Sequence, residues 1–83
     1  MKYRSRTDIV INILETTRSG AGKTKIMFDG YLSYRQTLAY IKFLKEADLL
    51  TCEEGTKLYR VTEKGLKFLS RSHELNELMV KNL

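Results

Sequence analysis

The hydrophobic pattern of the chain changes period near residue 50, and this change limits the folds that the chain can adopt. The preceding segment, SYRQTLAYIKFLKEADLL, has helical period, and Ser33 with Gln36 forms a capping box at its start. One face of this predicted helix carries Thr37, Leu38, Ile41, Leu44 and Ala47. The opposite face carries Arg35, Gln36, Ala39, Lys42, Lys45 and Glu46. An amphipathic helix with a largely cationic outer face is therefore predicted here.

A β-hairpin is predicted directly after this helix. The arms 50–52 and 58–61 are rich in residues that favour strands, and polar residues around Gly55 separate them. The change from helical period to short strands around a glycine turn indicates a mixed α and β domain that is mainly helical.

Two further helices are predicted toward the ends of the chain. Ser5 and Asp8 mark the start of the first helix and Gly20 its end, whereas Thr62 caps a last helix over residues 63–83. The apolar stripe of the first helix consists of Ile9, Val10, Ile13 and Leu14.

The segment KTKIMFDGYL has two readings. It can form a short helix over residues 23–29 that ends at Gly30, or two short strands around the Asp29-Gly30 pair. Local signals do not choose between them.

The stretch SGAGKT resembles the end of a phosphate-binding loop, so nucleotide binding has to be tested. Such a loop needs a glycine five residues before the last one, after a buried strand, and the residue there is Thr17 on a predicted helix. Gly20 and Gly22 are better explained as turn residues, and Lys23 begins the next element. ATP binding is not expected.

Other signals of catalysis or metal binding are weak. The chain has one His, His73, and one Cys, Cys52, so neither a zinc site nor a nucleophile–base pair has its usual ligands or partners. We therefore expect no enzyme activity, no metal and no cofactor.

The positive charge is unevenly distributed along the 83 residues, which suffice for one domain. Residues 1–45 contain nine Lys or Arg and three acids, a balance of +6, whereas residues 46–83 have a balance of −1. A basic region of this kind is typical of a surface that meets a polyanion. No segment has the apolar length of a membrane span or a secretory signal, so we expect a cytoplasmic protein.

Three segments resemble the winged helix-turn-helix superfamily. Residues 32–50 are similar to its recognition-helix block, which closes here with Asp48-Leu49-Leu50, and residues 58–65 are similar to the Y-x-x-T-x-K-G ending of the wing in many archaeal members. The run Lys23–Phe28, followed by Leu32-Ser33-Tyr34, carries a closer resemblance to small basic archaeal DNA-binding proteins that dimerise through a C-terminal helix.

This resemblance implies an α+β, mainly α fold with a three-helix core, a β-hairpin wing and a C-terminal helix. It assigns residues 1–62 to a DNA-binding domain and residues 63–83 to a dimerisation helix that pairs antiparallel with a second copy. It also makes residues 23–29 the first helix of the helix-turn-helix. The final helix is shorter than in the members compared.

The expected site residues follow from the position of the recognition helix in the major groove. Arg35 can pair with guanine and Gln36 with adenine, unless the capping box occupies Gln36, and Tyr40 is expected to pack against the first helix. The residues expected to contact DNA are Ser33, Tyr34, Arg35, Gln36, Ala39, Lys42, Lys45, Lys57, Arg60, Lys23, Lys25, Arg4 and Arg6. The residues expected at the dimer interface are Phe68, Leu75, Leu78, Met79 and Val80.

We therefore expect double-stranded DNA binding by a homodimer, as a nucleoid-associated transcription regulator or a sequence-tolerant architectural protein. Glu53 and Glu54 are expected to weaken contact through the wing. With no sensor domain, no small-molecule ligand is indicated. The alternative is a winged helix that serves as a protein–protein interaction module. Exposure of Arg35 and Lys42 on the recognition helix favours DNA, and their burial favours the alternative.

Overall fold

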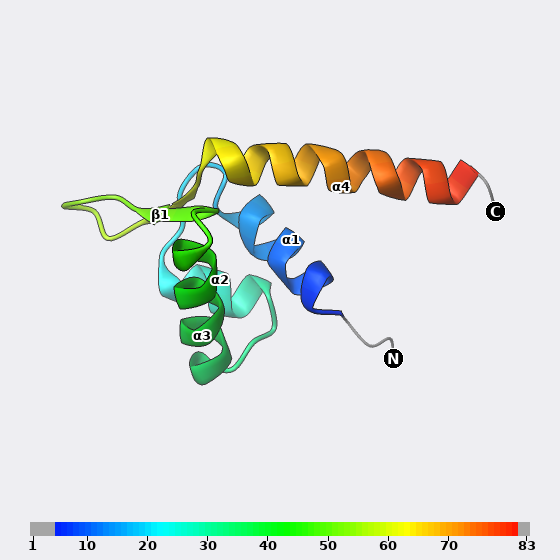
Figure 1. Cartoon of the computed structure of the whole chain (residues 1–83). Helices are drawn as coiled ribbons and strands as arrows, with labels where there is room; N and C mark the ends of the chain where they lie inside the picture. Colours follow the sequence, from blue (N-terminus) through cyan, green and yellow to red (C-terminus); the bar gives the residue numbers. More distant parts are fainter. Residues whose placement is uncertain (1–4, 82–83) are drawn as a thin grey trace.

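The computed structural model describes residues 5–81, apart from the side chains of residues 76 and 79–81, and within this part four helices flank one β-hairpin (Figure 1). In chain order, the elements are α1 (Arg6–Thr16), α2 (Lys23–Asp29), α3 (Tyr34–Glu46), β1 (Leu50–Cys52), β2 (Tyr59–Val61) and α4 (Glu63–Lys81). The mainly helical α+β fold expected from the sequence is confirmed. No helix in this part of the chain is both long enough and apolar enough to cross a membrane.

Helix α1 begins where the capping box predicts. The Ser5 hydroxyl accepts a hydrogen bond from the Asp8 backbone N–H at 3.1 Å, and the Asp8 carboxylate accepts one from the Ser5 N–H at 3.1 Å. The helix ends before Gly20, however: its last residue is Thr16 and its C-cap is Thr17, which is fully buried and donates its hydroxyl to the Ile13 carbonyl at 2.9 Å. The prediction that Gly20 ends the helix was therefore wrong by about one turn. Gly20 instead takes a positive φ of 94° in the loop that follows.

The ambiguous segment forms a helix. Helix α2 lies between Gly22 and Gly30 as its two caps, and Ile26 is its buried residue. The reading as two strands is wrong, and the reading implied by the resemblance is confirmed.

The hairpin is joined to the connection between α1 and α2. Leu50 pairs with Val61 and Cys52 with Tyr59 in an antiparallel register. Ala21 and Tyr59 also exchange two backbone hydrogen bonds, of 2.9 and 2.8 Å, on the other edge of β2. Ala21, in the loop before α2, thus pairs with β2 on the side opposite β1 and extends the sheet by one residue.

One apolar core connects every element. Its buried hydrophobic residues are Val10, Ile13, Leu14, Ala21, Ile26, Leu32, Ile41, Leu44, Leu50, Tyr59, Val61 and Leu69. Leu38, which the helical pattern placed on the buried face of α3, is 37% exposed, because it lies at the margin of that face. Tyr40, which was expected to pack against the first helix, is partly buried against the core.

Helix α4 is preceded by Thr62, which bonds its first turn, and the helix packs closely on the hairpin. The Thr62 hydroxyl accepts a hydrogen bond from the Gly65 N–H at 3.0 Å and donates one to the Asp48 carbonyl at 2.7 Å. A Cβ atom on Gly65 would lie 2.5 Å from the Val61 side chain and 2.6 Å from the Leu49 carbonyl oxygen. Only glycine allows this approach, which explains the glycine that ends the wing motif.

We predict that Gly65→Ala destabilises the fold by about 1–3 kcal/mol, the usual cost of overpacking a close contact. In an uncrowded helix the same change raises the free energy of unfolding by roughly 0.5–1 kcal/mol. A lower free energy of unfolding in Gly65→Ala therefore indicates the clash. Urea unfolding followed by circular dichroism measures it. Ser70→Ala, at an exposed position of the same helix, is the control. A Gly65→Ala variant as stable as the wild type would contradict the packing described.

Candidate nucleic-acid interface

Helix α3 exposes a face that carries two cations. Arg35, Ala39 and Lys42 are exposed and lie on the side of the helix away from the core. Among the described residues, neither Arg35 nor Lys42 has an ion-pair or hydrogen-bond partner. The buried side of the helix consists of Thr37, Ile41 and Leu44. Both cations can therefore reach a ligand without breaking an internal contact.

The first turn of α3 is fixed by a capping box. The Ser33 hydroxyl accepts from the Gln36 N–H at 3.1 Å, and the Gln36 side-chain oxygen accepts from the Ser33 N–H at 2.9 Å. The capping reading of these two residues is confirmed. A paired contact of Gln36 with adenine needs both ends of its amide and would have to replace the second bond. Of the two residues considered for base contact, Arg35 is thus the less constrained.

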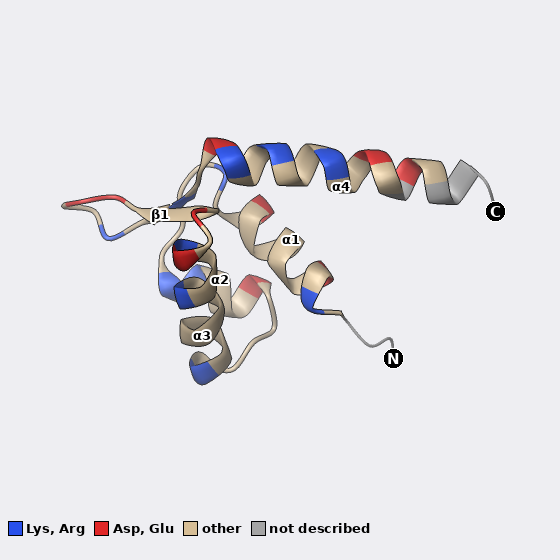
Figure 2. Cartoon of the chain, viewed as in Figure 1, with Lys and Arg blue, Asp and Glu red and all other residues tan. Residues whose placement is uncertain are grey.

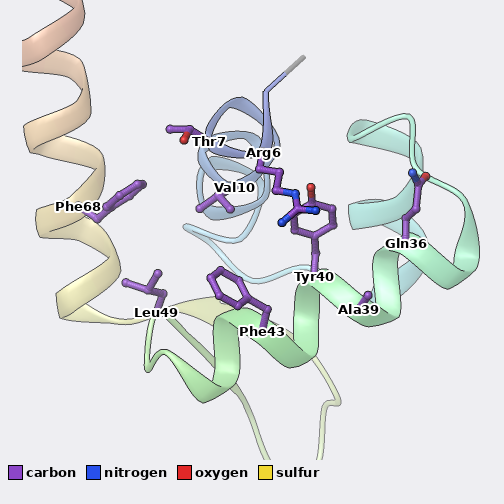
Figure 3. Close-up of a pocket in the computed structure, with 9 residues that line it drawn as sticks. All are labelled: Arg6, Thr7, Val10, Gln36, Ala39, Tyr40, Phe43, Leu49 and Phe68. Carbon is purple, nitrogen blue, oxygen red and sulfur yellow. The ribbon is translucent and has the colours of Figure 1, made fainter. Parts of the chain in front are cut away.

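An apolar groove lies on one flank of α3. Its volume is about 690 Å³, and side chains of α1, α3 and α4 surround it (Figure 3). Gln36, Ala39 and Phe43 border it from α3, Arg6 lies on its α1 side, and Phe68 on its α4 side. Arg6 therefore stands beside the recognition helix rather than at a distance from it.

The wing contains an internal ion pair. Arg60 lies 3.0 Å from the Glu53 carboxylate, and its second terminal nitrogen donates to the Arg18 carbonyl at 3.3 Å. The guanidinium expected to contact DNA is thus engaged at the base of the wing. Lys57 is exposed in the turn, with a positive φ of 59°. Of the two cations in the wing, Lys57 is the one whose side chain has no ion pair in the described chain.

Residues in and before the loop that resembles a phosphate site make contacts within the protein. The Ala21 N–H donates to the Tyr59 carbonyl, and Thr17, where a phosphate loop needs its first glycine, is buried at the end of a helix. His73 lies 3.8 Å from the Glu15 carboxylate on the surface. No group of three potential metal ligands occurs among the described residues.

A family model described as winged helix-turn-helix matches residues 3–80. The chain belongs to the winged helix-turn-helix family. Among solved structures, a protein described as Sso10a-2, a DNA-binding protein from Sulfolobus solfataricus, is similar with a TM-score of 0.80 and 20% identity. The match covers 94% of this chain and 84% of that chain and shows a shared fold. Comparison with curated proteins finds no significant match.

As a winged helix-turn-helix, the chain uses α2 and α3 as the helix pair and the β1–β2 hairpin as the wing. The expected site residues are spread over several elements. Lys23 and Lys25 are exposed on α2, where Lys25 pairs with Asp29 at 3.2 Å, and Lys45 is exposed in the last turn of α3. Arg4 lies outside the described residues. The structure thus groups Arg35, Ala39 and Lys42 on one face of α3, whereas the remaining described cations lie on other elements or in the last turn of α3.

Two features of this winged helix-turn-helix were missed by the sequence reasoning. Lys64, Lys67 and Arg71 form a basic row on the first half of α4 (Figure 2), although the second half of the sequence has no net positive charge. Their spacing of three and four residues could have indicated it. Phe28 and Tyr31, next to the helix-turn-helix turn, are among the exposed large hydrophobic residues, and no periodicity marked them as exposed.

Proposed function

We propose that the protein binds double-stranded DNA as a homodimer, with α3 in the major groove. The observation that carries this proposal is the exposed pair Arg35 and Lys42 on the second helix of a winged helix-turn-helix. The DNA-binding description of the structurally similar Sulfolobus protein supports it. Such a protein acts on the nucleoid in the cytoplasm, as a transcription regulator or an architectural protein.

Each exposed residue of α3 has a role in this proposal. Arg35, in the first turn, makes a paired contact with a guanine edge, since the N-terminal residues of a recognition helix lie nearest the bases. Ala39, one turn further, allows close approach, and Lys42 and Lys45 contact phosphates. Lys57 adds a contact from the wing.

The wing itself contributes little to affinity in this proposal. Glu53 holds Arg60 in an ion pair, and Glu54 is exposed beside it, so the base and turn of the hairpin present both signs of charge. A phosphate that approaches the wing meets these carboxylates as well as Lys57. Recognition therefore depends mainly on α3.

Helix α4 supplies the dimer interface, and its exposed leucines lie in the second half. Leu75 and Leu78 are each 58% exposed, and this half of the helix projects beyond the other elements (Figure 1). Phe68 is partly buried against the core and also borders the groove. It therefore joins the proposed interface on α4 to the core of the domain. Met79 and Val80, also proposed for the interface, have side chains outside the described part of the chain.

The charges of α4 favour an antiparallel pair. Lys64, Lys67 and Arg71 lie in its first half, and Glu74 and Glu77 lie in its second half (Figure 2). Antiparallel pairing brings the basic half of one helix next to the acidic half of the other. A two-fold dimer built in this way presents two copies of α3 to two half-sites.

We predict that Arg35→Ala weakens binding to a preferred duplex by about 1–3 kcal/mol and reduces discrimination between duplexes. Lys42→Ala should weaken binding to all duplexes alike and reduce the slope of log affinity against log salt by about 1 per protomer. Fluorescence anisotropy with labelled duplexes over a salt series measures both. Arg18→Ala is the control, because Arg18 already pairs with Glu15 at 2.8 Å on the end of α1. An affinity that does not depend on salt would contradict the proposal and favour a protein–protein interaction module.

We predict that Leu75→Gln weakens the dimer by about 100-fold or more, because both protomers lose a buried leucine worth about 1.5–3 kcal/mol. Leu66→Gln is the control, since nine residues of helix place Leu66 on the opposite side of α4 from Leu75. Sedimentation velocity over a concentration series measures the two variants. If both variants dimerise like the wild type, the interface lies elsewhere.

A further inference from the structure

The apolar groove beside α3 continues into an exposed apolar stripe on α4. Phe68 forms the α4 side of the groove (Figure 3). Leu75 follows seven residues later and leaves α4 on nearly the same side, because seven residues turn a helix by about 700°, close to two full turns. Leu75 is 58% exposed. Apolar surface therefore extends from the groove along the half of α4 that projects beyond the other elements.

The α3 side of the groove also carries exposed apolar surface. Phe43 borders the groove and is 56% exposed, although it is a large aromatic residue. Val10 of α1 and Leu49, which follows α3, are further apolar residues that line it. An exposed apolar surface with rims of polar residues commonly marks an interaction site. The groove is thus a surface that a partner can cover with a gain in stability.

The occupant that fits this groove best is the second half of α4 of another copy. In the antiparallel pair proposed above, that half lies beside the first half of α4, where Phe68 borders the groove. When Leu75 of the partner subunit lies opposite Phe68, two-fold symmetry places the partner's Phe68 opposite Leu75. Both grooves of the dimer are then filled in the same way.

The area that a dimer needs supports this occupant. A stable interface buries about 800 Å² on each partner. Leu75 and Leu78, each 58% exposed, supply only a fraction of that area. Because Phe43 and Phe68 line one groove, an apolar side chain inserted there contacts both α3 and α4. The groove therefore adds the apolar surface that the helix pair lacks.

The charges at the groove favour a protein segment over nucleic acid. Arg6 lies on the α1 side of the groove, and Glu74 and Glu77 flank the exposed leucines of α4. Among the residues that the structure describes, none of these three takes part in an ion pair. A partner helix in the groove brings its two carboxylates toward Arg6, whereas a phosphate backbone would lose water against an apolar lining.

We propose that the groove between α1, α3 and α4 binds the second half of α4 of a second copy, with Leu75 of the partner subunit inserted between Phe43 and Phe68. This inference rests on the proposed homodimer and extends its interface to the recognition helix. Phe43 leaves α3 about 100° around the axis from Lys42, so the partner lies beside the face proposed to bind duplex and does not cover it. Dimer formation then supports α3 in the position in which it meets DNA.

The first test compares two exposed aromatic residues of α3. Phe43→Ala removes the ring at the groove, and because that ring is exposed, the thermal midpoint is expected to stay near that of the wild type. Tyr34→Ala is the matched control. Tyr34 is 58% exposed and precedes Phe43 by nine residues, which places it on the opposite side of α3. Sedimentation velocity over a concentration series gives the dimer dissociation constant of each variant.

A second variant changes the groove from α1. Thr7 is exposed and borders the groove in the first turn of α1. Thr7→Glu is compatible with the fold, because an acidic residue in the first turn of a helix is favourable. In the dimer, the new carboxylate lies beside the acidic half of the partner's α4 and against apolar side chains. It should therefore weaken the dimer without removing any apolar side chain.

A double-mutant cycle tests direct contact between the two subunits. Leu75→Ala and Phe43→Ala are measured singly and together by the same method. Residues that touch across an interface give effects that do not multiply, because the second change removes a contact that the first has already lost. A purely structural effect of Phe43→Ala within its own subunit would give independent effects.

We expect Phe43→Ala to raise the dimer dissociation constant by about tenfold or more, since the dimer contains two such grooves. Thr7→Glu should also raise it, Tyr34→Ala should change it by less than twofold, and the double variant should lose clearly less than the product of the single losses. A Phe43→Ala dimer as strong as the wild type, an equal loss in Tyr34→Ala, or independent effects in the cycle would overturn the inference. Failure of the homodimer proposal is distinguishable, because the wild type itself then sediments as a monomer at every concentration.

Discussion

The hairpin is clamped from both sides, and this clamp ties it to the end of α1, to the loop before α2 and to α4. On one side, Ala21 and Tyr59 exchange two backbone hydrogen bonds, and the Val61 N–H donates to the Thr17 carbonyl at 3.2 Å. On the other side, Gly65 lets α4 approach Val61 so closely that no side chain fits between them. In a domain of this size the core is thin, so backbone bonds between distant segments carry a large share of the specificity of the fold. Helix α3 packs its own buried face, Thr37, Ile41 and Leu44, on the core and leaves Arg35 and Lys42 exposed.

The charges that remain unpaired after folding, rather than the total charge, determine what the protein can bind. Arg60, Lys25 and Arg18 are each engaged with a carboxylate, whereas Arg35 and Lys42 have no such partner in the described chain. Exposed ion pairs contribute little to stability, so their main effect here is to reduce the positive field of the wing and of α2. Among the described residues, the cations without a carboxylate partner include Arg35 and Lys42 on α3 and the row Lys64, Lys67 and Arg71 on α4.

Sequence patterns predicted most of the fold because its helices begin with local signals. The capping boxes at Ser5 and Ser33 depend on residues three positions apart, and the structure contains both. Features that depend on distant partners were not predictable: the Thr17 carbonyl accepts from the Val61 N–H, and Ala21 pairs with a residue 38 positions later. At the site, the exposed face of α3 followed from helical period, whereas the engagement of Arg60 follows from the hairpin that brings Glu53 beside it. The exposure of Phe28 and Tyr31 was also missed, since an aromatic residue next to a turn is equally compatible with burial.

The central claim is that the outward face of α3 is the surface that meets duplex DNA. Titration of isotope-labelled protein with a short duplex, followed by amide chemical shifts in NMR spectra, tests it most directly. The largest changes are expected at Arg35, Ala39 and Lys42, with smaller changes at Lys57. Changes confined to α1 and α4, with α3 unaffected at saturating DNA, would contradict the account.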